Sequence, residues 1–225
     1  MKIFLVLFAL LTIFTNSKAQ NNMEKVNSII QTVKEKFAPD KRVALFNIEA
    51  AESGDNIIIK GETNLPEAKS EFVKNMKEAG LTFKDDIEML PSKVLGNKIY
   101  GVINLSVANF RAKPDHPAEL VTQAILGTPV KVFKKGEDGY YTVQTPDGYI
   151  SWLDDDGFSF MTEDQWNEWR SSPKIIYTKE YGFSYSETDV NSQTVSDLVA
   201  GNLLKIMGED SDFYLVNYPD GRTAY

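Results

Sequence analysis

The sequence contains no cysteine among its 225 residues, and it contains a single histidine, His116. The lack of cysteine excludes disulfide bonds, cysteine-based zinc sites and thiol catalysis by this chain. One histidine cannot supply a site with several histidine ligands, and it makes a histidine-dependent catalytic triad difficult to build. We therefore expect this chain to lack the activity of the common hydrolytic enzymes, and we expect no metal site and no cofactor.

The sequence also lacks an excess of basic residues. It has 24 lysines and arginines against 32 acidic residues, a formal net charge of -8. Nucleic acid is therefore not expected as a partner, because no surplus of cations is present to neutralise phosphates. Hydrophobic residues make up 42% of the chain and aromatic residues 12%, which is enough for packed cores. At roughly 150 residues per domain, the length allows one large domain or two to three small ones.

Long hydrophobic runs are absent apart from residues 3–14. This run is shorter than the roughly 18 to 20 apolar residues that a bilayer-spanning helix needs. Lys2 precedes it, and a polar segment with the small residues Ser17 and Ala19 follows it. The pattern predicts a secretory signal peptide over residues 1–19, cleaved before Gln20. We expect an exported protein of the periplasm or cell envelope, with no membrane span after cleavage.

The next segment, residues 22–95, has the pattern of a small α+β domain with the order α-β-β-α-β. Apolar residues first recur at helical spacing, at Val26, Ile29, Ile30, Val33 and Phe37. Two strands follow, one led by residues 43–46 and one over residues 57–61, joined by a turn at residues 53–56. A strand over residues 86–90 is expected to end the domain.

A second helix is expected between these strands. Asn64 and Glu67 have the spacing of a capping box at its start, and Gly80 marks its end. The stretch NIIIKGETNLPEAKSEFVKNMKEAG, residues 56–80, resembles the BON domain, in which a hydrophobic strand and a glycine precede a turn and an amphipathic helix. That family is associated with periplasmic proteins and with phospholipid or protein surfaces. The resemblance implies an alternative function, a periplasmic protein–protein or lipid-surface scaffold that acts through this domain.

The rest of the chain contains an internal repeat, because residues 121–152 can be aligned with residues 195–225. Val121, Gly127 and Val132 match Val195, Gly201 and Ile206 at an offset of 74. After one deletion, Tyr140, Tyr141, Val143, Pro146, Gly148 and Trp152 match Phe213, Tyr214, Val216, Pro219, Gly221 and Tyr225 at an offset of 73. Short strands and a retained Pro-Asp-Gly turn favour two tandem small β-barrels over a solenoid.

We therefore expect an α+β domain followed by all-β structure, with barrels at residues 100–161 and 173–225. In the first barrel, a strand from Val107 and a long polar loop precede three short strands joined by hairpins. A linker helix is predicted over residues 162–172, capped by Thr162. Its aromatic residues and a preceding one are expected to dock it onto a barrel: Phe160, Trp166 and Trp169. This docking favours a rigid pair of barrels over two barrels on a flexible tether.

Two motifs of the first barrel resemble bacterial SH3 (SH3b) domains. NFRAKP, residues 109–114, resembles the Asn-Val-Arg-x-x-Pro opening of that family. DGYISWL, residues 147–153, resembles the Asp-Gly-Tyr-x-Gly-Trp-Val ending seen in Bacteroidetes NlpC/P60 cell-wall peptidases, with Ser151 in place of glycine. In such peptidases the SH3b barrels precede a papain-like domain, which cleaves peptidoglycan stem peptides with a cysteine nucleophile and a histidine base. Without a cysteine, no catalytic residue can be carried over to this chain.

The second copy is expected to be an incomplete barrel. It reaches Tyr225, which aligns with Trp152, and so it has no counterpart of residues 153–161, whose last residues are expected to form another strand of the first barrel. The resemblance implies that the chain is the accessory N-terminal portion of a longer γ-D-glutamyl endopeptidase. Its own function would be to bind or position on peptidoglycan or its stem peptides, with a catalytic peptidase domain as a further partner.

The first barrel supplies the candidate ligand-binding residues, which are Arg111, Tyr140, Tyr141, Tyr149 and Trp152. Aromatic faces stack on sugars or peptides, and an arginine binds a carboxylate with two parallel hydrogen bonds. The alternatives are a core position for the aromatic residues and a structural ion pair for the arginine. His116 is expected to be an exposed loop residue. For residues 154–156, three consecutive aspartates, a solvated acidic turn is favoured over a Ca²⁺ site because the spaced pattern of a calcium loop is absent.

Overall fold

A computed structural model of the chain describes residues 2–54 and 56–225, with side chains from Gln20 onward. The side chains of the predicted signal peptide lie outside the described residues. By its internal contacts the chain divides into two units, Met1–Leu90 and Pro91–Tyr225. Among the helices of the described residues, none has both the length and the apolar composition needed to cross a bilayer.

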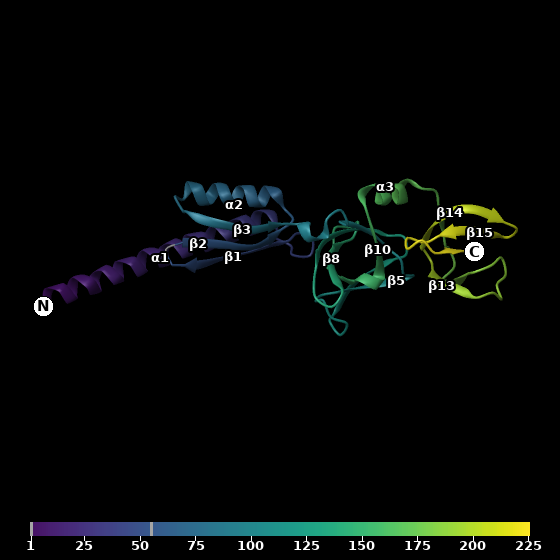
Figure 1. The fold of residues 1–225 in the computed structure, drawn as a ribbon, viewed down its shortest axis with the longest axis horizontal. Helices are drawn as coiled ribbons and strands as arrows, with labels where there is room; N and C mark the ends of the chain where they lie inside the picture. The colour runs from purple at the N-terminus through teal and green to yellow at the C-terminus, as the bar shows by residue number, and fades with distance from the viewer. Residues whose placement is uncertain (1, 55) are drawn as a thin grey trace. The chain divides into compact units, whose positions relative to one another are not determined.

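The first unit contains two helices and a three-stranded sheet in the predicted order (Figure 1). Its elements are α1 (Lys2–Phe37), β1 (Phe46–Ser53), β2 (Asn56–Thr63), α2 (Pro66–Glu78) and β3 (Phe83–Met89). The strand order is β1-β2-β3, with β1 antiparallel and β3 parallel to β2. The helix α2 supplies the crossover that a parallel pair requires.

Both helices cover one face of this sheet, because their apolar faces share a single core with alternate strand residues. The core residues are Val26, Val33, Ala68, Phe72 and Met76 from the helices, and Phe46, Ile48, Ile57, Ile59 and Ile87 from the strands. The residues between them, such as Asn47, Glu49 and Lys60, are exposed on the opposite face. The period of two in the strands therefore gives a sheet with one buried and one solvated face.

The predicted capping box at the start of α2 is wrong. The cap residue is Leu65, which supplies no side-chain hydrogen bond, and Pro66 starts the helix. The Asn64 side chain turns instead to the sheet, where its Oδ1 accepts a hydrogen bond from the Leu45 backbone N–H at 2.8 Å. Proline at the first helical position has no N–H to satisfy, so the helix can begin without a side-chain cap.

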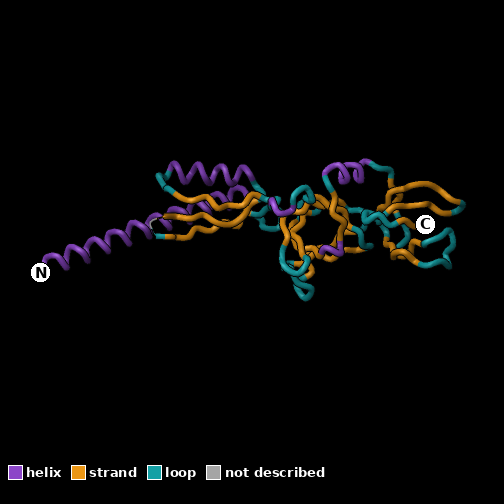
Figure 2. The backbone as a smooth tube through the Cα atoms, viewed as in Figure 1, coloured by secondary structure: helices purple, strands orange, loops and turns teal. Residues whose placement is uncertain are grey.

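The second unit begins with a seven-stranded sheet that curls into a ring, which we call the first repeat (Figure 2). A short 3-10 turn, η1 (Lys93–Leu95), precedes it. Its elements are β4 (Tyr100–Ile103), β5 (Val107–Arg111), β6 (Leu120–Ile125), β7 (Pro129–Lys135), β8 (Tyr140–Gln144), β9 (Ile150–Asp154), the 3-10 turn η2 (Asp155–Gly157) and β10 (Phe158–Met161). The strand order is β10-β4-β7-β8-β9-β5-β6. The predicted strands are confirmed, and β4 and β6 are additions to them.

The linker helix, α3 (Glu163–Ser171), is confirmed together with its cap. Thr162 accepts a hydrogen bond from the Gln165 backbone N–H, and the Gln165 side chain accepts one from the Thr162 N–H. This reciprocal pair satisfies two of the free donors at the helix start.

Two tryptophans dock α3 as predicted. Trp169 is 5% exposed, and its Nε1 donates a hydrogen bond to the Gly127 carbonyl at 3.1 Å. The Trp166 ring stacks on Tyr100 with centroids 4.7 Å apart. Phe160, which was expected to help dock the helix, packs instead against the core of the first repeat.

The second repeat follows α3 with two smaller sheets. Its strands are β11 (Lys174–Ile176), β12 (Tyr181–Tyr185), β13 (Thr194–Val199), β14 (Leu203–Asp210), β15 (Phe213–Asn217) and β16 (Thr223–Ala224). The sheet orders are β11-β14-β15-β16 and β12-β13. Tyr185 and Tyr225 join them by two reciprocal backbone hydrogen bonds of 2.8 Å, at the position where Arg111 meets Trp152 in the first repeat.

The two repeats share a packed boundary. Leu126, at the end of β6, is fully buried in the core of the second repeat. Its carbonyl accepts a hydrogen bond from the Leu203 N–H at 3.0 Å, and the Ser106 hydroxyl donates one to Asp197 at 2.6 Å. These contacts agree with the expectation of a rigid pair rather than two domains on a flexible tether.

Candidate functional site

Three loops meet at one end of the first repeat, and we call this region the loop cluster. They are residues 112–119, residues 134–139 and residues 154–157, and the cluster includes the adjoining strand residues Arg111, Tyr140 and Trp152. The backbone at Gly136 lies so close to the indole of Trp152 that a Cβ there would be 2.4 Å from the ring. His116 reaches across to Asp154, with Nε2 and Oδ2 3.8 Å apart. Contacts between segments that are distant in sequence thus gather polar and aromatic side chains in one place.

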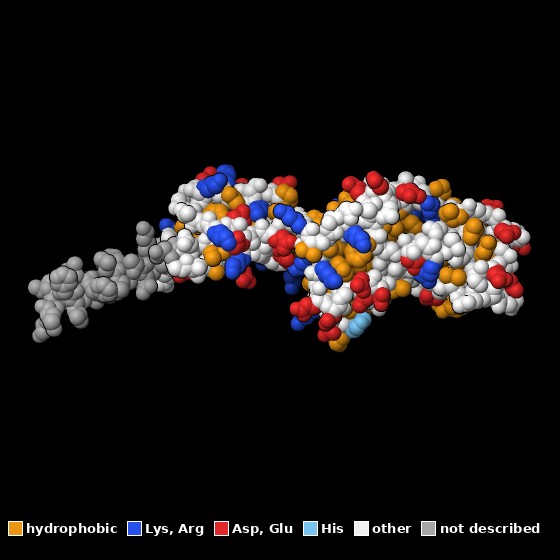
Figure 3. All heavy atoms as spheres, in the orientation of Figure 1, with side chains coloured by type: hydrophobic (Ala, Val, Ile, Leu, Met, Phe, Trp, Pro, Cys, Tyr) orange, Lys and Arg blue, Asp and Glu red, His pale blue; other side chains and the backbone are white. Residues whose placement is uncertain are grey.

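A histidine–tyrosine pair forms the centre of the loop cluster. The Tyr140 side chain is also a core residue, only 3% exposed, but its hydroxyl lies 3.1 Å from His116 Nδ1, and the two rings meet edge to face. Burial raises the pKa of Tyr140, and the negative charge of Asp154 raises it further. Tyr140 therefore stays a neutral hydroxyl that can accept or donate toward the imidazole. The His116 side chain is 81% exposed, and it stands at the surface beside acidic side chains (Figure 3).

Arg111 fixes one of the loops and retains guanidinium donors that can bind a ligand. Its Nη1 donates a hydrogen bond to the Ala118 carbonyl at 3.1 Å, which fixes the turn of residues 112–119. Within residues 20–54 and 56–225, no carboxylate lies close enough to Arg111 to form an ion pair. The structure therefore lacks the structural ion pair that was the alternative interpretation of this residue, and the remaining guanidinium donors can meet a ligand carboxylate.

Trp152 provides the flat apolar surface of the loop cluster. Its indole is half-buried against Gly136. The ammonium group of Lys134 lies over the ring, 5.4 Å from its centroid. A cation above an indole face is attracted by the ring quadrupole, so this contact orients both side chains.

The loop cluster contains three of the five predicted residues, and the other two lie elsewhere. Tyr141 is 8% exposed and packs in the core, with Phe158 and Phe160 ring centroids 5.9 and 4.9 Å from its own. Tyr149 lies in the β8–β9 hairpin turn, at the other end of β8. Sequence reasoning missed the participation of His116 in the cluster, since its contact with Tyr140 depends on how the long loop folds back.

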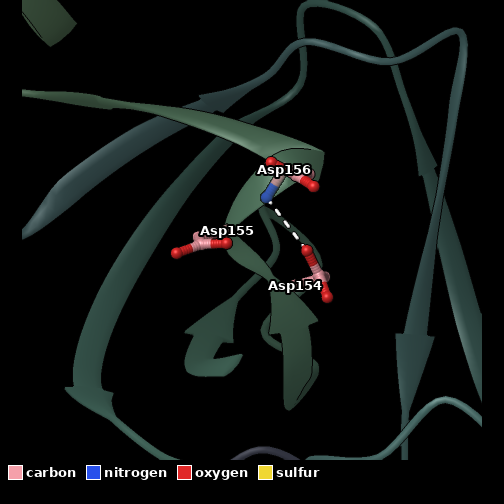
Figure 4. Close-up of side chains that lie close together, drawn as sticks. All are labelled: Asp154, Asp155 and Asp156. Atoms are coloured by element: carbon pink, nitrogen blue, oxygen red, sulfur yellow. Dashed lines mark hydrogen bonds between the residues drawn. The ribbon is translucent and has the colours of Figure 1, made fainter. Parts of the chain in front are cut away.

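The three consecutive aspartates form a capped turn at the edge of the loop cluster. Their carboxylate oxygens lie within 4.8 Å of one another. Asp154 caps η2 by accepting a hydrogen bond from the Asp156 N–H at 3.0 Å, and the three side chains leave the backbone in different directions (Figure 4). A backbone N–H therefore already occupies one of these oxygens, and the arrangement is that of a helix cap.

A groove lies between α3, β4, β7 and the β8–β9 turn, and it has a volume of about 570 Å³. We call it the α3 groove. Arg170 lies over the Trp166 ring at 4.4 Å, and that ring in turn stacks on Tyr100. The Trp166 Nε1 is buried without a hydrogen-bond partner. The spacing of Trp166 and Arg170, four residues apart on a helix, is the sequence signal that could have indicated this groove.

Comparison with known proteins relates these features to a domain family. Residues 110–158 match the family described as the bacterial dipeptidyl-peptidase SH3 domain. No curated protein matches the chain. An NlpC/P60 family protein from Bacillus cereus has a similar structure, with 19% sequence identity and a TM-score of 0.45 over 56% of this chain and 53% of that protein.

A novel NlpC/P60 endopeptidase from Photobacterium damselae is also similar, with 13% identity and a TM-score of 0.44. The match covers 60% of this chain and 33% of that protein. The chain thus covers about half of the first solved structure and a third of the second. The family match includes Arg111, Tyr140 and Trp152, so the loop cluster belongs to the matched segment. Residues 110–158 are therefore similar to an SH3 domain of the bacterial type.

Proposed function

We propose that the first repeat binds peptidoglycan stem peptides through the loop cluster, and that the chain is an exported, non-catalytic accessory part of a cell-wall peptidase system. The observation that carries this proposal is the convergence of Arg111, His116, Tyr140 and Trp152 at one end of an SH3 domain. The chain has no cysteine nucleophile, so the cleavage itself belongs to a separate catalytic domain.

The chemistry of the loop cluster suits short peptides that carry both carboxylates and amines. Arg111 offers guanidinium donors to a carboxylate, and a charge-assisted pair of this kind is stronger than a neutral hydrogen bond. The part of the Trp152 indole that Gly136 and Lys134 leave exposed offers a surface on which a peptide plane or methyl group can pack. Asp155 is exposed beside them and can pair with the amine of a diamino acid.

The second repeat is included in this proposal as a second SH3-type module, and the first unit as a BON-like module. The matching backbone hydrogen bonds of the two repeats support the former. The α-β-β-α-β order of the first unit supports the latter. Placing the chain in the periplasm or cell envelope rests on the signal peptide expected over residues 1–19.

Co-sedimentation with purified sacculi, followed by calorimetric titration with soluble stem peptides, tests the proposal. The wild-type chain should pellet, and Arg111→Gln should weaken stem-peptide binding about tenfold, because a hydrogen bond to a charged group contributes about 1.5–3 kcal/mol. Arg170→Gln, in the α3 groove, is the matched control and should bind like the wild type.

Thermal unfolding of each variant shows whether the fold is intact. If the wild-type chain fails to pellet over a range of salt concentrations, the proposal is overturned, and a scaffold role through the first unit is favoured. If Arg170→Gln weakens binding while Arg111→Gln does not, the loop cluster is not the binding site.

A further inference from the structure

The two repeats of the second unit have the same strand ladder at their first strand. In the first repeat, three backbone hydrogen bonds connect residues 99–103 with residues 127–132: Val132 N–H to Ile99 O, Ile103 N–H to Thr128 O, and Gly127 N–H to Ile103 O. In the second repeat the same three bonds occur 74 residues later: Ile206 N–H to Pro173 O, Tyr177 N–H to Asn202 O, and Gly201 N–H to Tyr177 O. The strand β11 is therefore the structural counterpart of β4.

The other edge of this first strand differs between the repeats. In the first repeat, β10 pairs antiparallel with β4, with Ser159 opposite Val102. In the second repeat, β11 pairs with β14 alone among the strands of the described residues. The backbone groups of Pro173 and Tyr177 form hydrogen bonds toward β14. Because backbone N–H and C=O groups alternate in direction along a strand, those of Ile176 point away from β14. An unpaired strand edge of this kind is a template for another strand.

Side chains that are buried in the first repeat are uncovered in the second. Val102 is fully buried, whereas its counterpart Ile176 is 55% exposed. Tyr141 is 8% exposed under the aromatic rings of β10, whereas its counterpart Tyr214 is 44% exposed. Both exposed residues line a groove of about 540 Å³, which we call the β11 groove. Ile175, Leu204 and Val216 form part of its apolar lining.

We infer that the β11 groove is a strand-acceptor site that binds an extended polypeptide segment with apolar side chains at alternate positions. The first repeat shows the occupant that such an edge takes. There Phe158 and Phe160, on alternate positions of β10, point together at Tyr141. The partner segment pairs antiparallel with β11 and places apolar side chains at two alternate positions over Tyr214. Backbone hydrogen bonds to the edge provide the affinity, and the two side-chain positions provide the specificity, as in strand addition generally.

One residue changes the specificity from that of the first repeat. A Cβ on Gly101 would lie 2.5 Å from the Phe158 ring, so that aromatic ring needs glycine beneath it. The counterpart of Gly101 is Ile175, whose side chain occupies the same space. The partner segment therefore carries a smaller apolar residue, such as valine, at the first position and an aromatic residue at the second.

Peptide binding to the full chain tests this inference. The probe is a fluorescein-labelled peptide with the sequence of residues 156–162 in which Phe158 is replaced by valine, and binding is followed by anisotropy. We expect saturable binding, and at least tenfold weaker binding for a control peptide with serine at both apolar positions. Ile175→Gly should reverse the preference between the two peptides. The peptide with the unchanged sequence of residues 156–162 should bind this variant at least tenfold more tightly than it binds the wild-type chain.

A second measurement locates the peptide. Amide chemical shifts should change at Ile176 and Tyr214 and stay unchanged at Val102, because the β4 edge is already paired. Equal binding of the serine control peptide, shifts at Val102 in place of Ile176, or no saturable binding would each overturn the inference. Concentration-dependent dimers that the peptide does not dissociate would also overturn it, since the groove would then be covered by a second copy.

Discussion

The two repeats of the second unit have equivalent strand ladders, but they differ in what covers them. In the first repeat, β10 pairs with β4, and α3 covers the outer face of these strands, where Trp169 packs with Val102 and Met161. In the second repeat, the equivalent edge of β11 and the side chain of Ile176 are exposed. The comparison shows that one closing strand decides whether the edge of such a ladder is covered or exposed.

The repeats also differ at the end where the loop cluster lies. The residues of the cluster are Arg111, His116, Tyr140 and Trp152. Their counterparts, with the offset of 74 extended to the first two and the offset of 73 kept for the others, are Tyr185, Val190, Phe213 and Tyr225. The cation and the titratable ring are thus replaced by a phenol and an aliphatic side chain. These substitutions remove the groups that would bind a carboxylate, so the proposed stem-peptide site is confined to the first repeat.

The largest expected change in stability concerns α3, the helix that links the two repeats. Trp169→Ala removes a buried indole and its hydrogen bond to Gly127, and it should lower the free energy of unfolding by about 3–5 kcal/mol. Trp166→Ala is the matched control, because Trp166 lies on the same helix and is half-buried, and its loss should be about 1 kcal/mol. Urea denaturation of both variants measures the difference, and equal losses would contradict the role assigned to Trp169.

The next prediction compares matched tyrosines in the two repeats. Tyr141→Ala should cost about 3 kcal/mol of unfolding free energy, because the ring is buried between the aromatic residues of β10. Tyr214→Ala should cost less than about 1 kcal/mol, because its ring is exposed. Chemical denaturation of the two variants under the same conditions tests this. A larger loss for Tyr214 would show that the β11 groove is closed in solution.

A smaller effect is expected at a buried tyrosine of the second repeat. The Tyr218 hydroxyl lies 2.6 Å from Ser184 Oγ, and burial raises the pKa of Tyr218. Tyr218→Phe should cost about 1 kcal/mol at neutral pH by removing this bond. The folded state holds the phenol proton more tightly than the unfolded state does. The stability that Tyr218 contributes is therefore complete below the ordinary tyrosine pKa of about 10 and is lost as the pH rises above it.

Denaturation between pH 8 and pH 11 measures this dependence. The alkaline decline should be less steep in Tyr218→Phe than in the wild type. The matched position of the first repeat is Thr145, which does not titrate in this range, so Thr145→Val should keep the alkaline slope of the wild type. An unchanged slope in Tyr218→Phe would contradict the effect of burial on its pKa.

Much of this fold could be predicted because its periodic signals are local. The helical spacing of α1 and the hairpin chemistry of Pro146, Asp147 and Gly148 each lie within a few residues. The strands β4 and β6 could not be predicted in this way. Three of the four residues of β4, from Gly101 to Ile103, are buried, so no alternation marks the strand. The capping box at Asn64 failed because its side chain bonds to Leu45, nineteen residues away in sequence.

The candidate site was predictable by residue type but not by geometry. Arg111, Tyr140 and Trp152 could be chosen from the chemistry of their side chains, and the structure brings them together. Tyr141 has the same chemistry as Tyr140, but four of the five residues of β8 are buried, so the strand pattern does not show which tyrosine faces the loops. The position of His116 depends on the fold of a long polar loop, which has no periodic signal.

An NMR titration of the ¹⁵N-labelled chain with a soluble stem peptide tests the central claim most directly, namely that the two repeats bind different ligands at different places. The account predicts shifts within residues 111–119, 134–140 and 152–157, and none at Ile176 or Tyr214. Shifts confined to the second repeat, or no shifts at saturating peptide, would contradict it.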